Sequence, residues 1–312
     1  MTRLAVTPRS FRAVPGRHLQ LLSAGPLEVR YPAVDRPLDE DEMIAFVAGC
    51  AALVVGLDPV SRRVLESGPL RVVVKYGSGL DNIDLDAAAE LGVQVRATPG
   101  ANSQGVAELT IGLLFALARH IIEHHKAAAE GSWERRLGRE LAGARLGLVG
   151  YGQVGRRVAA MALGLGMEVV ANDPLVRTAE VPLIELDELT GSCDAVSLHL
   201  PLTADTRGLV DRAFLRRMRR GAWLVNTARG GLVDFEALLE ALREGQLGGA
   251  AVDDFETRPL PDSELWALPN FIASPHAGAG TYEAAERTGV AAVEAVLELI
   301  GARLANETEQ EE

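Results

Sequence analysis

The sequence is poor in cysteine, in aromatic residues and in positive charge, and each shortage excludes a class of protein. Its two cysteines, Cys50 and Cys193, are too few for a disulfide scaffold, and their apolar surroundings predict reduced, buried thiols. Acidic residues outnumber basic ones by 43 to 31, and the net charge of −12 argues against nucleic acid or an anionic membrane as a partner. No apolar run of about 20 residues is without charges and glycines, so we expect no membrane span and a cytoplasmic protein.

Aliphatic residues supply most of the hydrophobic side chains. Hydrophobic residues make up 48% of the sequence and aromatic residues only 4%, so the cores must consist of leucine, valine and alanine. The length of 312 residues is typical of two domains.

The first part of the chain, residues 1–99, alternates short apolar runs with helical patterns. This alternation predicts a parallel sheet covered on both faces by helices. The expected strands are Leu4–Thr7, Leu27–Tyr31, Ala52–Val55, Val72–Lys75 and Val93–Arg96, and the expected helices are Asp39–Ala48, Ser61–Leu65 and Leu85–Leu91.

A second series of strands follows the breaker pair Pro99–Gly100. A long helix is predicted over Ala101–Ile122, with Ser103 as its N-cap, and a surface helix and loop over Glu123–Gly138. Six strands alternating with helices then predict a doubly wound sheet that binds its ligand at the carboxyl ends of the strands. These strands are Leu146–Val149, Val169–Ala171, Asp194–Leu200, Ala222–Asn226, Gly249–Asp253 and Phe271–Ser274, and the helices after residue 200 are Phe214–Arg220, Phe235–Gly245 and Ala284–Ile300.

The stretch 144–173, ARLGLVGYGQVGRRVAAMALGLGMEVVAND, carries the most specific pattern. A strand-like run leads into Gly150, Gly152 and Gly155 with the spacing G-x-G-x-x-G, and a helical pattern follows. Gly150 permits a tight turn, Gly152 lets a pyrophosphate approach the backbone, and Gly155 lets the helix pack closely. The helix N-terminus offers N–H groups and partial positive charge to the phosphates.

An acid ends the second strand of this unit. Asp173 lies where a carboxylate can accept hydrogen bonds from the ribose hydroxyls of the adenosine, and where a 2′-phosphate would be repelled. The sequence therefore predicts that this unit binds NAD rather than NADP.

Nearly the whole chain resembles the D-isomer-specific 2-hydroxyacid dehydrogenases, most closely the short phosphoglycerate-dehydrogenase-like members. The resemblance lies in six motifs: KYGSGLDNIDL at 75–85, TPGANSQGVAELT at 98–110, LVGYGQVG at 148–155, SLHLPLTADTRGLV at 197–210, LVNTARGGLVD at 224–234 and SPHAGAGT at 274–281.

The resemblance implies the domain layout and the reaction. Residues 1–99 plus 282–312 would form a flavodoxin-like substrate domain, and residues 100–281 a Rossmann NAD-binding domain inserted into it. The active site would lie in the cleft between them, with a homodimer formed mainly through the nucleotide domain. The expected activity is transfer of a hydride between the nicotinamide and a small D-2-hydroxy acid or its 2-keto acid.

Two residues fit the catalytic needs of that reaction. Arg229 follows the strand Ala222–Asn226, and a guanidinium there can bind a carboxylate bidentately and polarise the carbonyl. His276 follows the last strand, where an imidazolium can give a proton to the new alkoxide and a neutral imidazole can take it back.

The resemblance also implies roles for residues around these two. Near the substrate are Ser78 and Gly79, whose N–H groups would help hold its carboxylate, Asn102, and Lys75, which replaces a frequent arginine. Near the cofactor are Gln153 and Val154 at the pyrophosphate, Pro201 and Thr206 at the adenosine end, and Thr227, Asp253 and Gly278 around the nicotinamide.

The chain departs from the family pattern just before His276. The family usually has D-V-F-x-x-E-P, whereas residues 253–259 read DDFETRP, with Arg258 at the position of the glutamate. That glutamate pairs with the histidine and raises its pKa, whereas a nearby cation favours the neutral imidazole. Our hypothesis is that proton donation by His276 is weakened and that reduction of the keto acid fails above a lower pH than in relatives. Glu256 is an alternative partner.

The substrate remains open between two classes. The phosphoglycerate enzymes place basic residues after the strand equivalent to Ala52–Val55, whereas here Gly56-Leu57-Asp58 follows, and Arg62 and Arg63 come later. 3-Phosphoglycerate and a smaller 2-hydroxy acid are both candidates. A contrasting interpretation is an NAD-binding sensor or regulatory protein with vestigial catalysis, which Arg258 favours.

A metal site is not expected. His120 and His124 share one face of a helix, but no third ligand with suitable spacing accompanies them.

Overall fold

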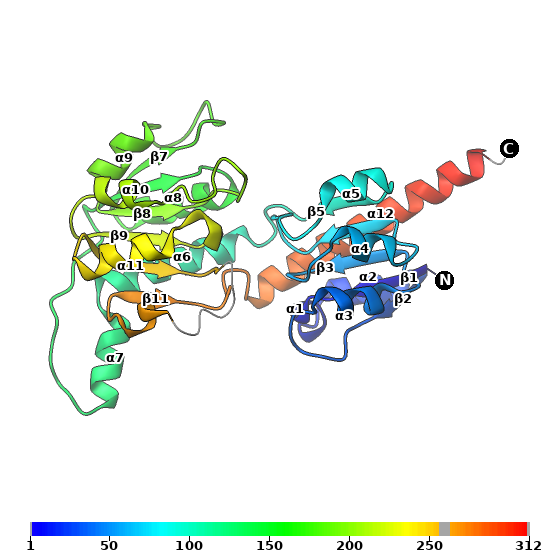
Figure 1. Ribbon diagram of the computed structural model, residues 1–312, viewed down its shortest axis with the longest axis horizontal. Coiled ribbons are helices and arrows are strands. Elements are labelled where there is room, and N and C mark those ends of the chain that lie inside the picture. The colour runs from blue at the N-terminus through cyan, green and yellow to red at the C-terminus, as the bar shows by residue number, and fades with distance from the viewer. Residues whose placement is uncertain (1, 256–262, 311–312) are drawn as a thin grey trace. The chain divides into compact units, whose positions relative to one another are not determined.

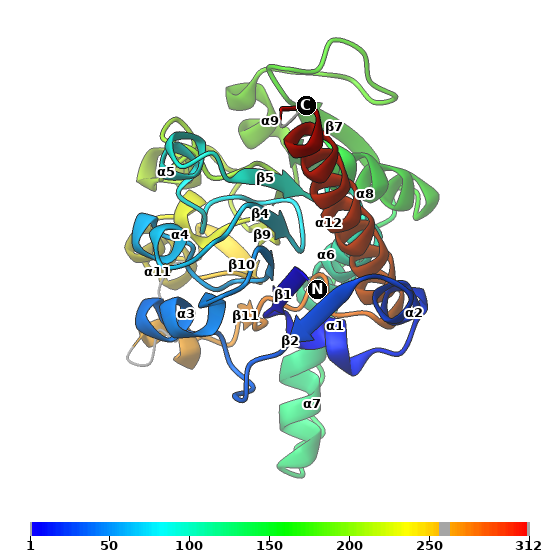
Figure 2. The same cartoon turned by 90° about the vertical axis from the view of Figure 1, so that its right-hand side faces the viewer.

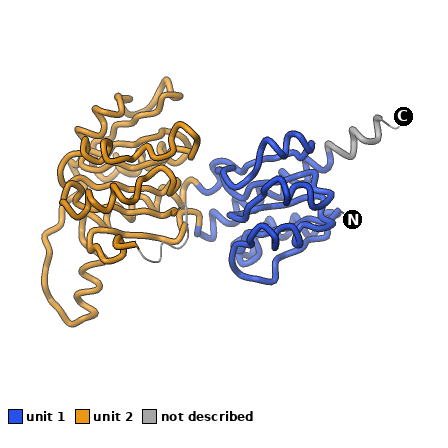
Figure 3. The backbone as a smooth tube through the Cα atoms, viewed as in Figure 1, with its two compact units in different colours: residues 1–102, 280–312 blue, residues 103–279 orange. Residues whose placement is uncertain are grey.

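Two parallel sheets divide the chain into two units. The computed structural model describes residues 2–255 and 263–310, with side chains through residue 301. Unit 1 combines residues 1–102 with 280–312, and unit 2 consists of residues 103–279, as Figure 3 shows by colour. The chain therefore leaves unit 1 once, builds unit 2 and returns.

Unit 1 is built on a five-stranded sheet with the order β2-β1-β3-β4-β5, in which every pairing is parallel. The sheet order 2-1-3-4-5 is that of flavodoxin-like folds. The strands are β1 (Thr2–Val6), β2 (Leu27–Arg30), β3 (Ala52–Val55), β4 (Val72–Lys75) and β5 (Gln94–Ala97). All five strands predicted for this part are present, with ends displaced by at most two residues.

Helices cover both faces of this sheet. Figure 2 shows one set of helices on one face and the second set on the other. The first set is α1 (Arg9–Ala13), α2 (Arg17–Ala24) and α12 (Tyr282–Gln310), and the second is α3 (Glu40–Val47), α4 (Arg62–Glu66) and α5 (Leu85–Glu90). The central strands β3 and β4 are buried at every position because both of their faces are covered.

Capping explains why three of these helices were visible in the sequence. Asp39 begins α3 with a capping box completed by Glu42, Ser61 caps α4, and Asp84 caps α5. Neither α1 nor α2 has a side-chain cap, and both were missed in the sequence.

Unit 2 is built on a six-stranded parallel sheet with the order β11-β10-β9-β8-β6-β7. The chain runs outward from β6 to β7 and then continues on the other side of β6 with β8. This reversal creates the crevice at the carboxyl ends of the strands where doubly wound sheets bind ligands. The strands are β6 (Arg145–Val149), β7 (Glu168–Asn172), β8 (Ala195–Leu198), β9 (Ala222–Asn226), β10 (Leu247–Val252) and β11 (Phe271–Ala273). Two doubly wound parallel sheets, as predicted, are thus confirmed.

Two hydrophobic layers enclose the sheet of unit 2. One contains α6 (Ser103–Ala118) and α8 (Gln153–Gly164), and the other contains α9 (Leu186–Ser192), α10 (Arg212–Arg217) and α11 (Phe235–Arg243). Short 3-10 helices η1 (Gly230–Leu232) and η2 (Glu264–Ala267) follow β9 and β10. The helix α7 (Ile121–Ala129) stands away from the sheet of its unit (Figure 1).

The long helix predicted over residues 101–122 is wrong in its extent. Helix α6 ends at Ala118, and α7 begins at Ile121 after a bend of 61°. His120 adopts the left-handed conformation with φ 51°, which interrupts the helix without a glycine or proline to signal it. Ser103, predicted as the N-cap, is buried and is the first residue of α6.

Among the described residues, no single helix has the length and hydropathy to cross a membrane. Helices α6 and α7 meet that test only together, as the bent pair.

Candidate functional site

The glycine turn after β6 is closed to side chains at two positions. Gly150 has φ +99°, and a Cβ there would lie 2.6 Å from the carbonyl oxygen of His199. A Cβ on Gly155 would overlap the carbonyl oxygen of Gly150. The first turn of α8 therefore packs directly on the turn that precedes it, as the spacing predicts.

Gly152 differs from Gly150 and Gly155 because the space where its Cβ would lie is open. No described atom lies within 4 Å of the position that a Cβ would take. Gly152 is also the N-cap of α8 and offers no side-chain hydrogen bond to the helix N-terminus. The backbone N–H groups of Gln153 and Val154 thus belong to an uncapped helix start of the kind that binds a pyrophosphate. These residues fit NAD at this turn.

Asp173 lies against the same turn. Its carboxylate accepts hydrogen bonds from the backbone N–H of Tyr151 at 2.8 Å and of Leu175 at 3.0 Å. Each carboxylate oxygen can accept more than one hydrogen bond, so ribose hydroxyls can share this group.

The loop after β8 is folded by its own hydroxyl groups. The Thr206 hydroxyl donates to the carbonyl of Pro201 at 2.7 Å and accepts from the N–H of Thr203 at 2.9 Å. His199 precedes this loop and lies 3.0 Å from the Ser197 hydroxyl, and burial lowers its pKa to about 3. His199 is therefore neutral.

Three neighbouring strands end in one row of the sheet. Asn226 of β9 pairs with Val252 of β10, which pairs with Ala273 of β11. Arg229 and His276 each lie three residues beyond this row. The register of the sheet thus brings the loops that carry them to the same edge.

Asn226 shapes the loop of Arg229. This buried side chain donates to the carbonyl of Arg229 at 2.8 Å and accepts from the N–H of Ala228 at 3.0 Å. The guanidinium of Arg229 donates to the carbonyl of Ala228 at 2.9 Å. Beside this loop, the Thr227 hydroxyl lies 2.8 Å from that of Thr110 on α6.

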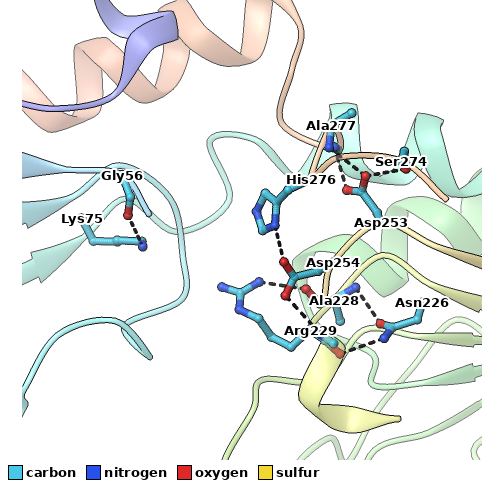
Figure 4. Close-up of polar contacts among 12 residues, drawn as sticks. Gly56, Lys75, Asn226, Ala228, Arg229, Asp253, Asp254, Ser274, His276 and Ala277 are labelled. Carbon is cyan, nitrogen blue, oxygen red and sulfur yellow. Dashed lines mark hydrogen bonds and ion pairs between the residues drawn. The ribbon is translucent and has the colours of Figure 1, made fainter. Parts of the chain in front are cut away.

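Asp253 shapes the loop of His276 in the same way. Its carboxylate, 3% exposed as a residue, accepts from the Ser274 hydroxyl at 2.6 Å and from the N–H groups of Ala277 at 2.7 Å and Gly278 at 2.9 Å. Figure 4 shows this carboxylate beneath the loop. Asp253 thus holds the histidine loop, and its place near the nicotinamide stays a prediction.

The imidazole of His276 has an acidic neighbour. Its Nδ1 lies 2.8 Å from Oδ1 of Asp254, and the Asp254 side chain is 7% exposed (Figure 4). The other carboxylate oxygen accepts from the N–H of Gly230 at 3.1 Å. Asp254 therefore contacts both the imidazole and the residue that follows Arg229.

His276 therefore has an acidic partner that the sequence analysis did not identify. The weakened proton donation expected from Arg258 stays a prediction, which the pH profile decides. Sequence reasoning missed Asp254 because it compared only the usual glutamate position. Arg258 and Glu256 lie outside the described residues. The signal that could have revealed Asp254 is the pair of adjacent carboxylates after a buried strand, because buried carboxylates require partners.

The residues predicted to bind substrate in unit 1 differ in their surroundings. The Lys75 ammonium is buried and donates to the carbonyl of Gly56 and the side chain of Asn82, each at 2.5 Å. Ser78 is exposed, Gly79 and Asn102 are half-buried, and no hydrogen bond between described residues uses the N–H of Ser78 or Gly79. Lys75 thus stabilises the loop, whereas Ser78 and Gly79 are suited to an anion.

Within the described residues, no cluster of histidine, cysteine and acidic side chains could hold a metal ion.

Unit 2 has the fold and the phosphate cradle of a dinucleotide-binding domain. Residues 111–278 match the family model for the D-isomer specific 2-hydroxyacid dehydrogenase NAD-binding domain. The hydroxypyruvate reductase of Thermotoga maritima is 40% identical over 273 residues, which cover 85% of this chain and 89% of that relative. The chain belongs to the D-isomer specific 2-hydroxyacid dehydrogenase family and is an NAD-dependent oxidoreductase.

Further relatives match most of this chain. The D-3-phosphoglycerate dehydrogenase of Methanocaldococcus jannaschii is 38% identical over 288 residues, which cover 89% of this chain but 55% of that protein. The chain thus spans about half the length of this enzyme and of the D-3-phosphoglycerate dehydrogenase of Rattus norvegicus. A crystal structure of the TT0316 protein from Thermus thermophilus has a TM-score of 0.88 and 39% identity, covering 96% of this chain and 97% of that one.

Proposed function

We propose that the protein reduces a small, unphosphorylated 2-keto acid with NADH, and catalyses the reverse reaction, through Arg229 and His276. The observation that carries this proposal is the partly buried contact between Asp254 and the His276 ring, on the strand edge that also presents Arg229. An imidazole with a carboxylate partner is the arrangement that a proton donor needs. It favours active chemistry over a sensor with vestigial catalysis.

Each residue has a distinct role in this mechanism. Bound NADH supplies the hydride, and the turn at Gly152 with the N–H groups of Gln153 and Val154 holds its pyrophosphate. The Arg229 guanidinium binds the substrate carboxylate and polarises the keto oxygen as negative charge develops there. Because Nδ1 of His276 faces Asp254, Nε2 is the nitrogen that gives its proton to the alkoxide.

The proposed substrate carries no phosphate because the cations after β3 are already engaged. Arg62 forms ion pairs with Glu66 and Glu90, and Arg63 forms ion pairs with Glu40 and Asp41.

Asp58, in the loop after β3, is also engaged within unit 1. It is buried and accepts hydrogen bonds from the Thr7 hydroxyl and from the N–H of Leu38 at 2.8 Å. A phosphate at this loop would therefore have to displace the acidic partners of Arg62 and Arg63. Hydroxypyruvate, the substrate in the name of the Thermotoga relative, fits better than 3-phosphoglycerate.

A carboxylate can also be bound by backbone N–H groups. We assign this role to the N–H groups of Ser78 and Gly79, which follow Gly77 with its φ of +134°. Thr98 holds this turn through the Gly77 N–H at 2.8 Å. Asn102 is assigned to the same ligand.

The activity test is NADH oxidation with hydroxypyruvate, glyoxylate, pyruvate and a branched 2-keto acid, each repeated with NADPH. We expect turnover with at least one small acid, a preference for NADH, and little activity in the oxidation of 3-phosphoglycerate. Tight NADH binding without turnover of any acid would contradict the proposed function. Faster turnover of 3-phosphoglycerate than of the small acids would overturn the substrate class alone.

We further propose a homodimer through unit 2. Helix α7 has no buried residue, and Trp133 and Leu137 in the loop after it are 82% and 97% exposed. An apolar surface of this kind is suited to burial against a second copy. Light scattering should give about twice the chain mass of 33.2 kDa. The double variant Trp133→Ser, Leu137→Ser should give a monomer, and a monomeric parent protein would exclude the dimer. The cytoplasmic location stays a prediction.

A further inference from the structure

We propose that Asp254 is the positioning residue of His276 and replaces the family glutamate whose position is occupied by Arg258. This inference rests on the proposed function, in which His276 exchanges a proton with the substrate. It predicts that the proton chemistry is intact despite the altered motif.

The geometry places the carboxylate directly on the ring. Oδ1 of Asp254 lies 2.8 Å from Nδ1 of His276, and the exposed fractions are 7% for the acid and 24% for the histidine side chain. At this distance and depth, solvent screens the interaction only weakly. The contact thus has the geometry of a charge-assisted hydrogen bond.

Hydrogen bonds with the backbone hold both partners in place. The second oxygen of Asp254 accepts from the Gly230 N–H at 3.1 Å, which ties the carboxylate to the Arg229 loop. The His276 N–H donates to the carbonyls of Asp253 at 2.7 Å and Ser274 at 3.0 Å. These bonds hold His276 at φ 56°, a conformation that non-glycine residues rarely adopt. The ring therefore has a defined orientation before any substrate binds.

The carboxylate also selects the tautomer of the ring. An ionised carboxylate only accepts hydrogen bonds, so Nδ1 must carry a proton in both charge states of the imidazole. Nε2 is then the nitrogen that gains or loses a proton as the ring titrates. The adjacent negative charge favours the imidazolium, which is the form that gives a proton during reduction.

Three charged residues that Figure 4 labels near the ring follow two strands of unit 2. Asp253 and Asp254 follow β10, and Arg229 follows β9 (Figure 4). Asp253 is engaged with the backbone of the histidine loop through Ala277 and Gly278, whereas Asp254 contacts the imidazole itself. Among the described residues of unit 2, Asp254 is thus the carboxylate that contacts the ring.

The first test needs no substitution at Asp254. Nitrogen-15 NMR of the full chain with NAD bound distinguishes the two tautomers of a neutral imidazole, and His276→Asn identifies the resonance. We expect the Nδ1–H tautomer at high pH. The Nε2–H tautomer, which is the commoner form in solution, would overturn the proposal.

The second test uses Asp254→Asn, which keeps the size of the side chain. Its oxygen must still accept from the Gly230 N–H, so its amide nitrogen faces Nδ1 and forces the other tautomer. We expect kcat for hydroxypyruvate reduction to fall about 100-fold, the typical size of a general-acid contribution. The KM for NADH should change little. The pH above which kcat/KM falls should decrease by about one unit or more, because the ring loses its negative neighbour.

Two further variants complete the design. Asp254→Glu keeps the charge and should restore part of the pH profile, which a merely structural defect would not show. Asp187→Asn removes an exposed carboxylate from α9 of the same unit and should leave kcat unchanged.

Failure of the inference and failure of the proposed function give different results. Parental kcat and pH profile in Asp254→Asn would refute the role of Asp254 while leaving the proposed enzyme activity intact. Absence of turnover in the parent would refute the proposed function, and the NMR titration of His276 would still decide whether Asp254 governs the ring.

Discussion

Two glycines of the turn after β6 differ in the space beside them, which is open at Gly152 and filled at Gly155. Gly155→Ala should destabilise the protein, and Gly152→Ala should impair binding of NADH. Both substitutions add the same methyl group and restrict the unfolded chain equally. Any difference between them therefore reports the folded surroundings of the two positions.

The expected magnitudes follow from those surroundings. At Gly155 the new Cβ would overlap the Gly150 carbonyl oxygen and lie 3.3 Å from its carbon, and this neighbour is backbone that cannot rotate away. Overpacking of this kind typically costs about 1–3 kcal/mol, which the better helix propensity of alanine offsets by about 1 kcal/mol. We expect a net loss of up to about 2 kcal/mol, which lowers the Tm of unit 2 by up to about 8 °C.

At Gly152 the methyl group meets no protein atom. The residue has a negative φ of −82°, so alanine meets no left-handed strain there, and the Tm without cofactor should change by less than about 1 °C. The methyl group would, however, occupy the space that the pyrophosphate needs. We expect the Kd for NADH to rise at least about tenfold, equivalent to about 1.4 kcal/mol.

Circular dichroism melting without cofactor and fluorescence titration with NADH measure the two effects. A Gly152→Ala protein that binds NADH like the parent would refute the assignment of the open side to the cofactor. Equal destabilisation by both substitutions would refute the packing argument.

Three further predictions concern single side chains. Arg229→Lys keeps the charge but loses the planar fork, so kcat/KM for the keto acid should fall about 100-fold in steady-state assays while NADH affinity, measured by titration, stays unchanged. Asp173→Ser should raise the ratio of NADPH to NADH turnover by at least about tenfold, because the carboxylate no longer repels a 2′-phosphate. His199 stays neutral in the folded state, with a pKa of about 3, but binds a proton near its ordinary value when unfolded. The free energy of unfolding should therefore fall as the pH drops from about 6.5 towards 3, by at most about 1.4 kcal/mol per pH unit. In His199→Gln the Tm should depend less on pH over that range, as measured by melting curves recorded at several pH values.

The sequence revealed the fold wherever a local signal was strong. Continuous aliphatic runs identified the buried strands, and capping residues such as Asp39 and Asp84 marked helices. The failures lie where such signals are absent. Helices α1 and α2 have no side-chain caps, and the break between α6 and α7 occurs at His120, a residue whose left-handed conformation no local pattern announces.

The candidate site was visible in the sequence as a set of motifs but not as a set of contacts. The glycine spacing, Asp173, Arg229 and His276 could all be identified, because each sits in a short pattern with a known chemical purpose. The partners of these residues come from other strands, as Asp253 and Asp254 do for His276. A linear motif records which residue usually occupies a position and cannot show which neighbour replaces it when it changes.

The register of the sheet explains how Asp254 can replace a residue from further along the chain. Asn226, Val252 and Ala273 form one row across β9, β10 and β11. Asp254 lies two residues beyond this row, while the arginine and the histidine each lie three beyond it. All three groups are thus positioned by the same ladder of backbone hydrogen bonds. This ladder continues past the row, because the Asp253 N–H donates to the carbonyl of Asn226 at 2.9 Å and the Ser274 N–H donates to the carbonyl of Val252 at 3.0 Å.

The carboxylate of Asp254 is fixed by the same sheet that positions Arg229 and His276. Successive residues at a strand end point in opposite directions, so two adjacent acids can do different work. Asp253 turns to the backbone of the histidine loop, and Asp254 turns to the imidazole. The substitution of Arg for Glu at position 258 is then compatible with catalysis, because the imidazole draws its negative neighbour from the edge of the sheet.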